Sequence, residues 1–219
     1  MRKILLLLPV TALLASACVF HTGNSTSWGP AEERDYALAG FDRVDSSAGV
    51  TVVMRQGPYA VHAKSANGDL SRLVLEVRGD TLVASRERMN FNWFDKGANY
   101  TITVSAPDYR GVSASSGSSI DGSGLSVKDL RVHVSSGADV DLSGSCASLN
   151  VSVSSGADFD GSNLQCETAS VDASSGADAD AFATRSADGD ASSGADITFH
   201  GRPGSISKDT SSGGSVRAL

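Results

Sequence analysis

The sequence predicts an all-β fold, a parallel β-solenoid (β-helix) with coils of about 19–20 residues, and three observations predict it. A Ser-Ser-Gly-Ala-Asp motif recurs four times with looser copies on both sides, and the central glycines of the copies are Gly117, Gly137, Gly156, Gly176, Gly194 and Gly213. Their intervals of 20, 19, 20, 18 and 19 residues are typical of stacked supersecondary units. Apolar residues recur at every second place around each motif, as in strands with one buried face.

Each repeat is expected to form a strand, a tight Ser-Ser-Gly turn and a second strand. One coil cannot bury its apolar side alone, so the coils stack about 4.8 Å apart and hydrogen-bond to one another. The second serines of the motifs share the parity of the apolar places, which predicts an internal ladder of hydroxyls. Gly189, Lys208 and Thr210 replace apolar residues in the last two coils, which we expect to be the weakest.

Residues 1–17 have the pattern of a signal peptide. Arg2 and Lys3 precede an apolar run, 4–14, that is too short to span a bilayer. Small residues 15–17 then precede Cys18, and two alternatives stay open. The segment suits an ordinary signal peptidase, which would give a secreted protein. It also resembles a lipobox, with Ala15 where leucine is usual, and Cys18 would then carry a lipid that holds the chain in the cell envelope, at the outer membrane.

The mature chain divides into three parts. Residues 18–35 lack a period and are expected to form a flexible tether. Residues 36–110 contain non-repetitive strands, and Arg78-Gly79-Asp80 is expected to form a hairpin turn between two of them. Residues 111–219 carry the repeats.

A loop at 86–99 concentrates aromatic residues. Phe91, Trp93 and Phe94 lie there among charges and amides without a clean period. Aromatic rings on a loop can stack on sugars or dock a partner, so these three are candidates for ligand contact. The alternative is that they cap the open end of the solenoid.

Charge and motifs exclude several function classes. The formal net charge is −7, which argues against binding to nucleic acid and to anionic lipid surfaces. The four histidines are scattered, and no nucleophile-elbow or phosphate-loop motif occurs. We therefore expect neither an enzyme nor a cofactor.

Aspartates recur at two places of the repeat. One set is Asp139, Asp158, Asp178 and Asp196, and the other is Asp121, Asp141, Asp160 and Asp180. Stacked coils turn each set into a column in which like charges about 4.8 Å apart repel by roughly 1 kcal/mol per pair. Calcium bound along the first set would relieve that repulsion. The alternative, without a metal, is that turn N–H groups donate to each carboxylate while water solvates its outer oxygen.

Cys146 and Cys166 fall at nearly the same place on adjacent coils. The distance between coils suits a disulfide, and the compartment is oxidising. We predict a bridge, with two buried thiols as the alternative.

The repeats and several shorter motifs resemble the bacterial head GIN domain family, also called putative auto-transporter adhesins, a family of unknown function. The motifs are the Gly-Phe-Asp-x-Val opening at 40–44, Val-Val-Met-Arg-Gln-Gly at 52–57, Val-Ser-Ala-Pro at 104–107 and Gly-Arg-Pro at 201–203. The resemblance covers residues 36–219. It implies an extracytoplasmic β-helix-like domain, often on lipoproteins, and it brings no catalytic residues.

Together these observations favour a cell-envelope lipoprotein whose solenoid binds a ligand such as a glycan, as an adhesin would. One alternative is a structural envelope protein without a specific ligand. Another is a polysaccharide-acting enzyme that uses Arg131 and His133, which the sequence suggests lie beside the aspartate columns.

Overall fold

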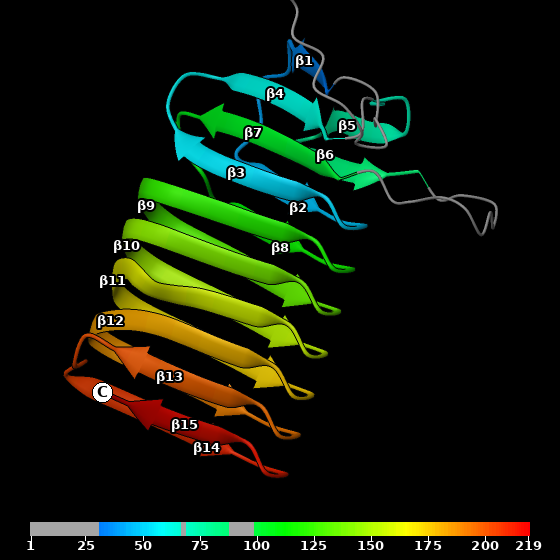
Figure 1. The fold of residues 1–219 in the computed structure, drawn as a ribbon. Helices are drawn as coiled ribbons and strands as arrows, with labels where there is room; N and C mark the ends of the chain where they lie inside the picture. Colours follow the sequence, from blue (N-terminus) through cyan, green and yellow to red (C-terminus); the bar gives the residue numbers. More distant parts are fainter. Residues whose placement is uncertain (1–30, 67–68, 88–98) are drawn as a thin grey trace, which may run out of the picture.

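The computed structural model describes residues 31–66, 69–87 and 99–219. This part of the chain contains fifteen strands and no helix (Figure 1). The strands are β1 (Glu32–Tyr36), β2 (Arg43–Ser46), β3 (Thr51–Gln56), β4 (Ala60–Ser65), β5 (Leu73–Arg78), β6 (Thr81–Arg86), β7 (Tyr100–Ala106), β8 (Gly111–Ala114), β9 (Ser119–Ser135), β10 (Asp139–Ser154), β11 (Asp158–Ser174), β12 (Asp178–Ala191), β13 (Asp196–His200), β14 (Ser205–Thr210) and β15 (Ser215–Ala218).

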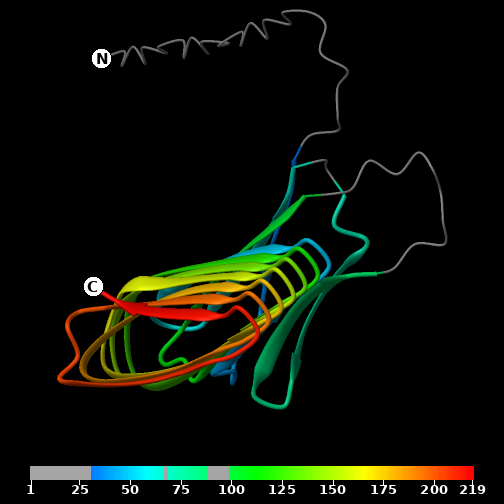
Figure 2. The same ribbon diagram turned by 90° about the horizontal axis from the view of Figure 1, so that it is seen from below.

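The repeats form a parallel β-solenoid, as predicted. The strands β9 to β12 are each 14–17 residues long, and each pairs in parallel with the next through two stretches separated by an irregularity. The first stretch of β9 pairs with β3, whereas its second stretch pairs with β8. Each coil therefore crosses two walls, and Figure 2 shows the coils stacked as flattened rings.

The first wall consists of β1, β4, β7, β3, the first halves of β9 to β12, and then β13 and β15. The second wall consists of β5, β6, β2, β8, the second halves of β9 to β12, and then β14. The N-terminal strands thus continue both walls of the solenoid upward (Figure 1).

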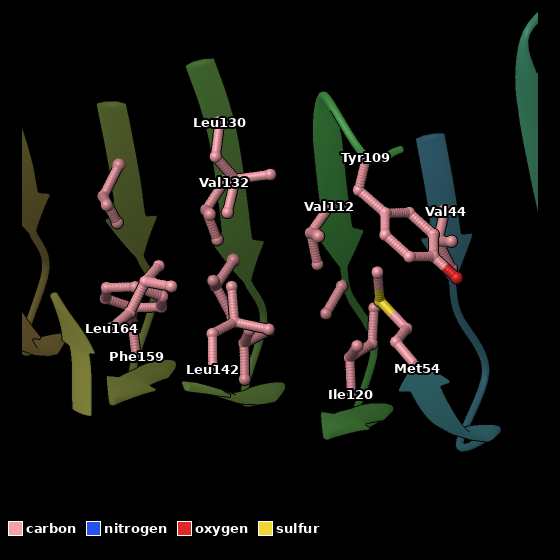
Figure 3. Close-up of a cluster of buried hydrophobic side chains, with 14 of the residues drawn as sticks. Val44, Met54, Tyr109, Val112, Ile120, Leu130, Val132, Leu142, Phe159 and Leu164 are labelled. Carbon is pink, nitrogen blue, oxygen red and sulfur yellow. The ribbon is translucent and has the colours of Figure 1, made fainter. Parts of the chain in front are cut away.

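The core lies between the walls and consists of stacked apolar columns. Ile120, Val140, Phe159, Ala179 and Ile197 form one column from the first wall, and all five are buried. Val112, Val132 and Val151 face them from the second wall. Figure 3 shows Ile120 and Leu142 approaching the side chains of the opposite wall.

Large and small residues complement each other between coils. A Cβ placed on Gly189 would meet the Phe199 ring at 2.8 Å, so this glycine makes room for that ring. Gly189 is therefore not a packing defect. The last coil still differs from the others, since all six residues of β14 are exposed.

The Ser-Ser-Gly turns differ from the expected hydroxyl ladder. The second serine of each motif has φ between 50° and 61°, and the following glycine also has positive φ. Two successive positive φ values are the geometry of a type I′ turn, which breaks the two-residue alternation of the strands. The serine side chains consequently point to solvent, and all six serines are exposed. The predicted internal ladder of hydroxyls was wrong because it extended the two-residue alternation of the strands through the turn.

The turns hydrogen-bond along the rod through their backbones instead. The Gly137 N–H donates to the Ser155 carbonyl at 3.2 Å, and the Gly156 N–H donates to the Ser175 carbonyl at the same distance. The hydrogen-bond ladder therefore continues around the turn.

The last residues of the expected tether, 32–35, are part of a strand. Residues 32–35 belong to β1, which pairs antiparallel with β4. Charged side chains on β1 place a polar strand at the edge of the first wall, which disfavours edge-to-edge association. The hairpin predicted at Arg78-Gly79-Asp80 is present, since β5 and β6 pair antiparallel from Arg78 and Thr81.

Candidate functional site

The predicted signal segment, Cys18, and the aromatic residues Phe91, Trp93 and Phe94 lie outside the described residues. Within the described ranges, no helix is long and apolar enough to cross a membrane.

Cys146 and Cys166 are direct partners in the parallel register of β10 and β11. The structure joins them in a disulfide with 4.4 Å between the Cα atoms. Both residues are buried. The bridge therefore ties two adjacent coils together, between their two walls.

The aspartates stack in register on the outer face of the first wall. Asp139 pairs with Asp158, Asp158 with Asp178, and Asp178 with Asp196. The second set, from Asp121 to Asp180, stacks in the same way beside it. The first wall thus presents a two-column acidic face.

In the middle of the acidic face, burial and neighbouring carboxylates disfavour the charged form of two aspartates. Partial burial raises the pKa of the Asp141 carboxyl above its ordinary value of 3.8, and Asp160 and Asp121 raise it further. Partial burial, then Asp178 and Asp139, raise the pKa of Asp158 in the same way. Burial disfavours the charged form, and neighbouring like charges add to that effect.

Protein groups relieve the repulsion mainly at the C-terminal end of this face. His200 Nε2 lies 2.9 Å from an oxygen of Asp180, and Arg217 donates to Asp196 at 3.5 Å. The Ser162 N–H also donates to Asp160 at 2.9 Å. The described part of the chain contains no group of three or more His, Cys, Asp or Glu side chains arranged to hold a metal ion.

A groove runs along the outer face of the second wall, across β2, β8, β9, β10, β11, β12 and β14. It consists of three adjoining hollows that share Asn150, with volumes of about 620, 400 and 440 Å³. Seven strands at about 4.8 Å spacing make it about 29 Å long. We call this surface the second-wall groove.

Short outward side chains explain why the groove forms. In the paired register, Arg43 faces Gly111 and Gly111 faces Arg131, so the middle strand contributes no side chain between the two arginines. A Cβ on Gly111 would meet Arg43 Cγ at 3.0 Å, which places the Arg43 side chain across the gap. Farther along, short polar side chains line the groove together with four apolar residues. The polar residues are Ser148, Asn150, Thr168, Ser170, Ser186, Ser205 and Ser207, and the apolar ones are Leu149, Ala169, Ala187 and Ile206.

Cations gather at the β2–β9 end of the groove. Between residues 99 and 200 the chain has four arginines and lysines, and Arg110, Lys128 and Arg131 line the groove. Asp42 holds two of the groove arginines, since its carboxylate lies 3.5 Å from Arg110 Nε and 3.9 Å from Arg43 Nε. Arg43 also pairs with Asp80 at 3.6 Å.

Lys128 and Arg131 form no ion pair within the described residues. The carboxylates of Asp45, Asp108 and Asp129 also border this end. Burial raises the pKa of Asp45, while His133 and then Arg78 lower it. The groove therefore offers two unpaired cations beside a network of paired ones.

The structure separates two residues that were expected together. Arg131 and His133 line the second-wall groove, whereas the aspartate columns lie on the first wall, across the core. The expectation that these basic residues lie beside the columns was wrong, because positions close in the repeat fall on opposite walls of a coil. The groove itself was missed, although the small residues at the outward places of the second wall signal it.

The chain matches the model of one protein family, the putative auto-transporter adhesin, head GIN domain, over residues 40–203. The chain belongs to this family. Its Gly-Phe-Asp-x-Val opening supplies Asp42 and Arg43, which stand at the basic end of the groove.

Solved structures share the fold. A putative adhesin from Bacteroides fragilis aligns with a TM-score of 0.64 at 17% identity, covering 87% of this chain and 97% of that one. A putative lipid binding protein from Parabacteroides distasonis aligns over the same shares with a TM-score of 0.53 at 15% identity. At such identities the likeness shows the fold alone. A search of curated proteins found no match.

Proposed function

We propose that this head GIN domain protein is a non-catalytic binding protein of the cell envelope, with an adhesin-like role, and that its recognition surface is the second-wall groove. The groove is the observation that carries the proposal. It is long, it presents cations, hydroxyls and an amide among apolar residues, and it lies on a rigid sheet rather than on a loop. A rigid, preformed surface loses little conformational freedom when it binds.

The N-terminal segment supports an envelope location. A signal sequence at residues 1–17, cleaved before Cys18, would export the chain, and a lipid on Cys18 would anchor it to the outer membrane. One acyl chain binds membranes weakly, so stable anchoring requires more than one chain on that cysteine. The name of the Parabacteroides neighbour mentions lipid binding, but the cations of this groove and its serine, threonine and asparagine side chains favour a ligand with polar groups.

An array of glycans and cell-wall polymers tests the binding role. The probe is the mature chain, residues 18–219, with Cys18→Ser so that no lipid attaches. We expect selective binding that Gly111→Leu abolishes, because the new side chain would displace the Arg43 side chain that crosses the glycine. If no polymer binds, a structural role without a specific ligand is favoured instead.

Fractionation of cells tests the anchor. The wild-type chain should sediment with membranes, and Cys18→Ala should release it into the soluble fraction. Membrane association that survives this substitution would contradict lipid anchoring at Cys18.

A further inference from the structure

The second-wall groove has two chemically different parts, and this difference limits what it can hold. Cations cluster at the β2–β9 end, whereas serine and threonine hydroxyls, the Asn150 amide and interspersed apolar residues line the rest as far as β14. Resting on the proposed binding function, we infer that the groove binds an oligosaccharide whose one acidic group, a carboxylate or phosphate, lies between Arg43 and Arg131.

The basic end can hold such a group because of how its arginines are placed. Arg43 and Arg131 lie on strands two apart, and the Arg43 side chain crosses Gly111 on the strand between them, so an oxyanion beside that side chain can face both arginines. A planar guanidinium donates two parallel N–H groups to a carboxylate or phosphate. Arg131 and Lys128 lack ion-pair partners in the described chain, so an incoming anion need not displace one.

Asp42 keeps two of the cations in place. Its carboxylate lies within 4 Å of both Arg43 and Arg110, and the Arg110 N–H donates to the Asp42 carbonyl at 2.7 Å. These long side chains are therefore partly ordered before a ligand arrives, so they lose less conformational entropy on binding.

The remaining length suits uncharged sugar units. Serine and threonine hydroxyls and the Asn150 amide can each donate and accept, as sugar hydroxyls do. An apolar ligand would leave these groups unpaired at a cost of about 1–3 kcal/mol for each one buried. Asp188 lines the far end, so a second acidic group there would be repelled. The acidic group therefore belongs at one end only.

Isothermal titration with defined glycans tests this inference. The probes are an oligosaccharide ending in glucuronate, its methyl ester, and the same backbone ending in a sugar phosphate. The lipid-free mature chain should bind one or both acidic forms, and the ester should bind at least about tenfold more weakly, because it loses a charge-assisted hydrogen bond. The two acidic probes distinguish a carboxylate from a phosphate source.

Matched variants locate the contact. Arg131→Gln should weaken binding of the acidic probe by about tenfold, and Gly111→Leu should abolish it. Arg185→Gln removes the same charge outside the groove, where Arg185 pairs with Glu167, and should leave affinity unchanged. Thermal melts confirm that each variant is folded.

Three outcomes would overturn the inference. They are equal affinity for the acid and its ester, acidic-probe binding that Arg131→Gln leaves intact, and no binding of any probe. The first leaves the proposed binding role standing with a neutral ligand. The third leaves that role standing only if the array finds a different ligand that Gly111→Leu abolishes.

Discussion

At the scale of single residues, the exposed serines of the turns adopt a backbone conformation that is unusual for serine. Each of them has positive φ in front of a glycine that also has positive φ. Serine adopts this backbone less readily than asparagine or glycine, which are the preferred residues of type I′ turns. The side chain of this serine therefore does not pack in the core.

Substitution of Ser155 tests this view of the turn. Ser155→Asn should raise the free energy of unfolding by a few tenths of a kcal/mol, because asparagine tolerates this backbone better. Ser155→Val should lower it by roughly 1 kcal/mol. Urea unfolding measures both. A large loss of stability in Ser155→Asn would instead indicate a buried hydroxyl at this position.

The acidic face gives a residue-scale prediction about pH. The raised pKa of Asp141 and Asp158 means that the folded protein holds these protons more tightly than the unfolded chain does. The contribution of these two carboxyls to the free energy of unfolding should therefore fall as pH rises from about their ordinary pKa of 3.8 through their raised pKa in the folded protein.

Asp158→Asn should raise the melting temperature at pH 7. The melting temperature of the variant should also fall less than that of the wild type as pH rises over this range. Added salt should narrow the gap between variant and wild type, because it screens exposed charges. Asp129→Asn, outside the columns, is the control. A variant less stable than wild type at pH 7 would show that the charge of Asp158 is not a liability.

At the scale of elements, the sequence predicted the repeated coil well and the first part of the chain less well. The period and the two-residue alternation were sufficient to place Val140 over Ile120 and Cys146 beside Cys166. They could not show that Asp121 and Arg131 lie on opposite walls, because the bend within each long strand leaves no clear signal. β1 was missed because its charged residues show no strand period.

The disulfide is a covalent link between two adjacent coils, and it gives a prediction at this scale. It closes a loop with a sequence separation of 20, which corresponds to about 3 kcal/mol in the chain-entropy model. The double variant Cys146→Ala, Cys166→Ala should lose stability of this order, measured by urea unfolding. Free thiols that titrate in the unreduced, denatured Cys18→Ser chain, which keeps only Cys146 and Cys166, would contradict the bridge.

At the scale of the whole molecule, the two walls have different outer surfaces. The first wall carries the acidic columns, and the second carries the groove with its basic end. The sequence could not reveal this division of charge, since the net charge of −7 averages over both walls. A net negative protein can thus still present a local site for an anionic group.

The central claim is that the second wall, and not the first, is the recognition surface. Amide hydrogen exchange of the lipid-free mature chain, with and without the glycan that binds most tightly, tests it most directly. Bound glycan should slow exchange in β2, β8 and the second halves of β9 and β10, and leave β13 and β15 unchanged. Protection confined to the acidic face of the first wall would contradict the claim.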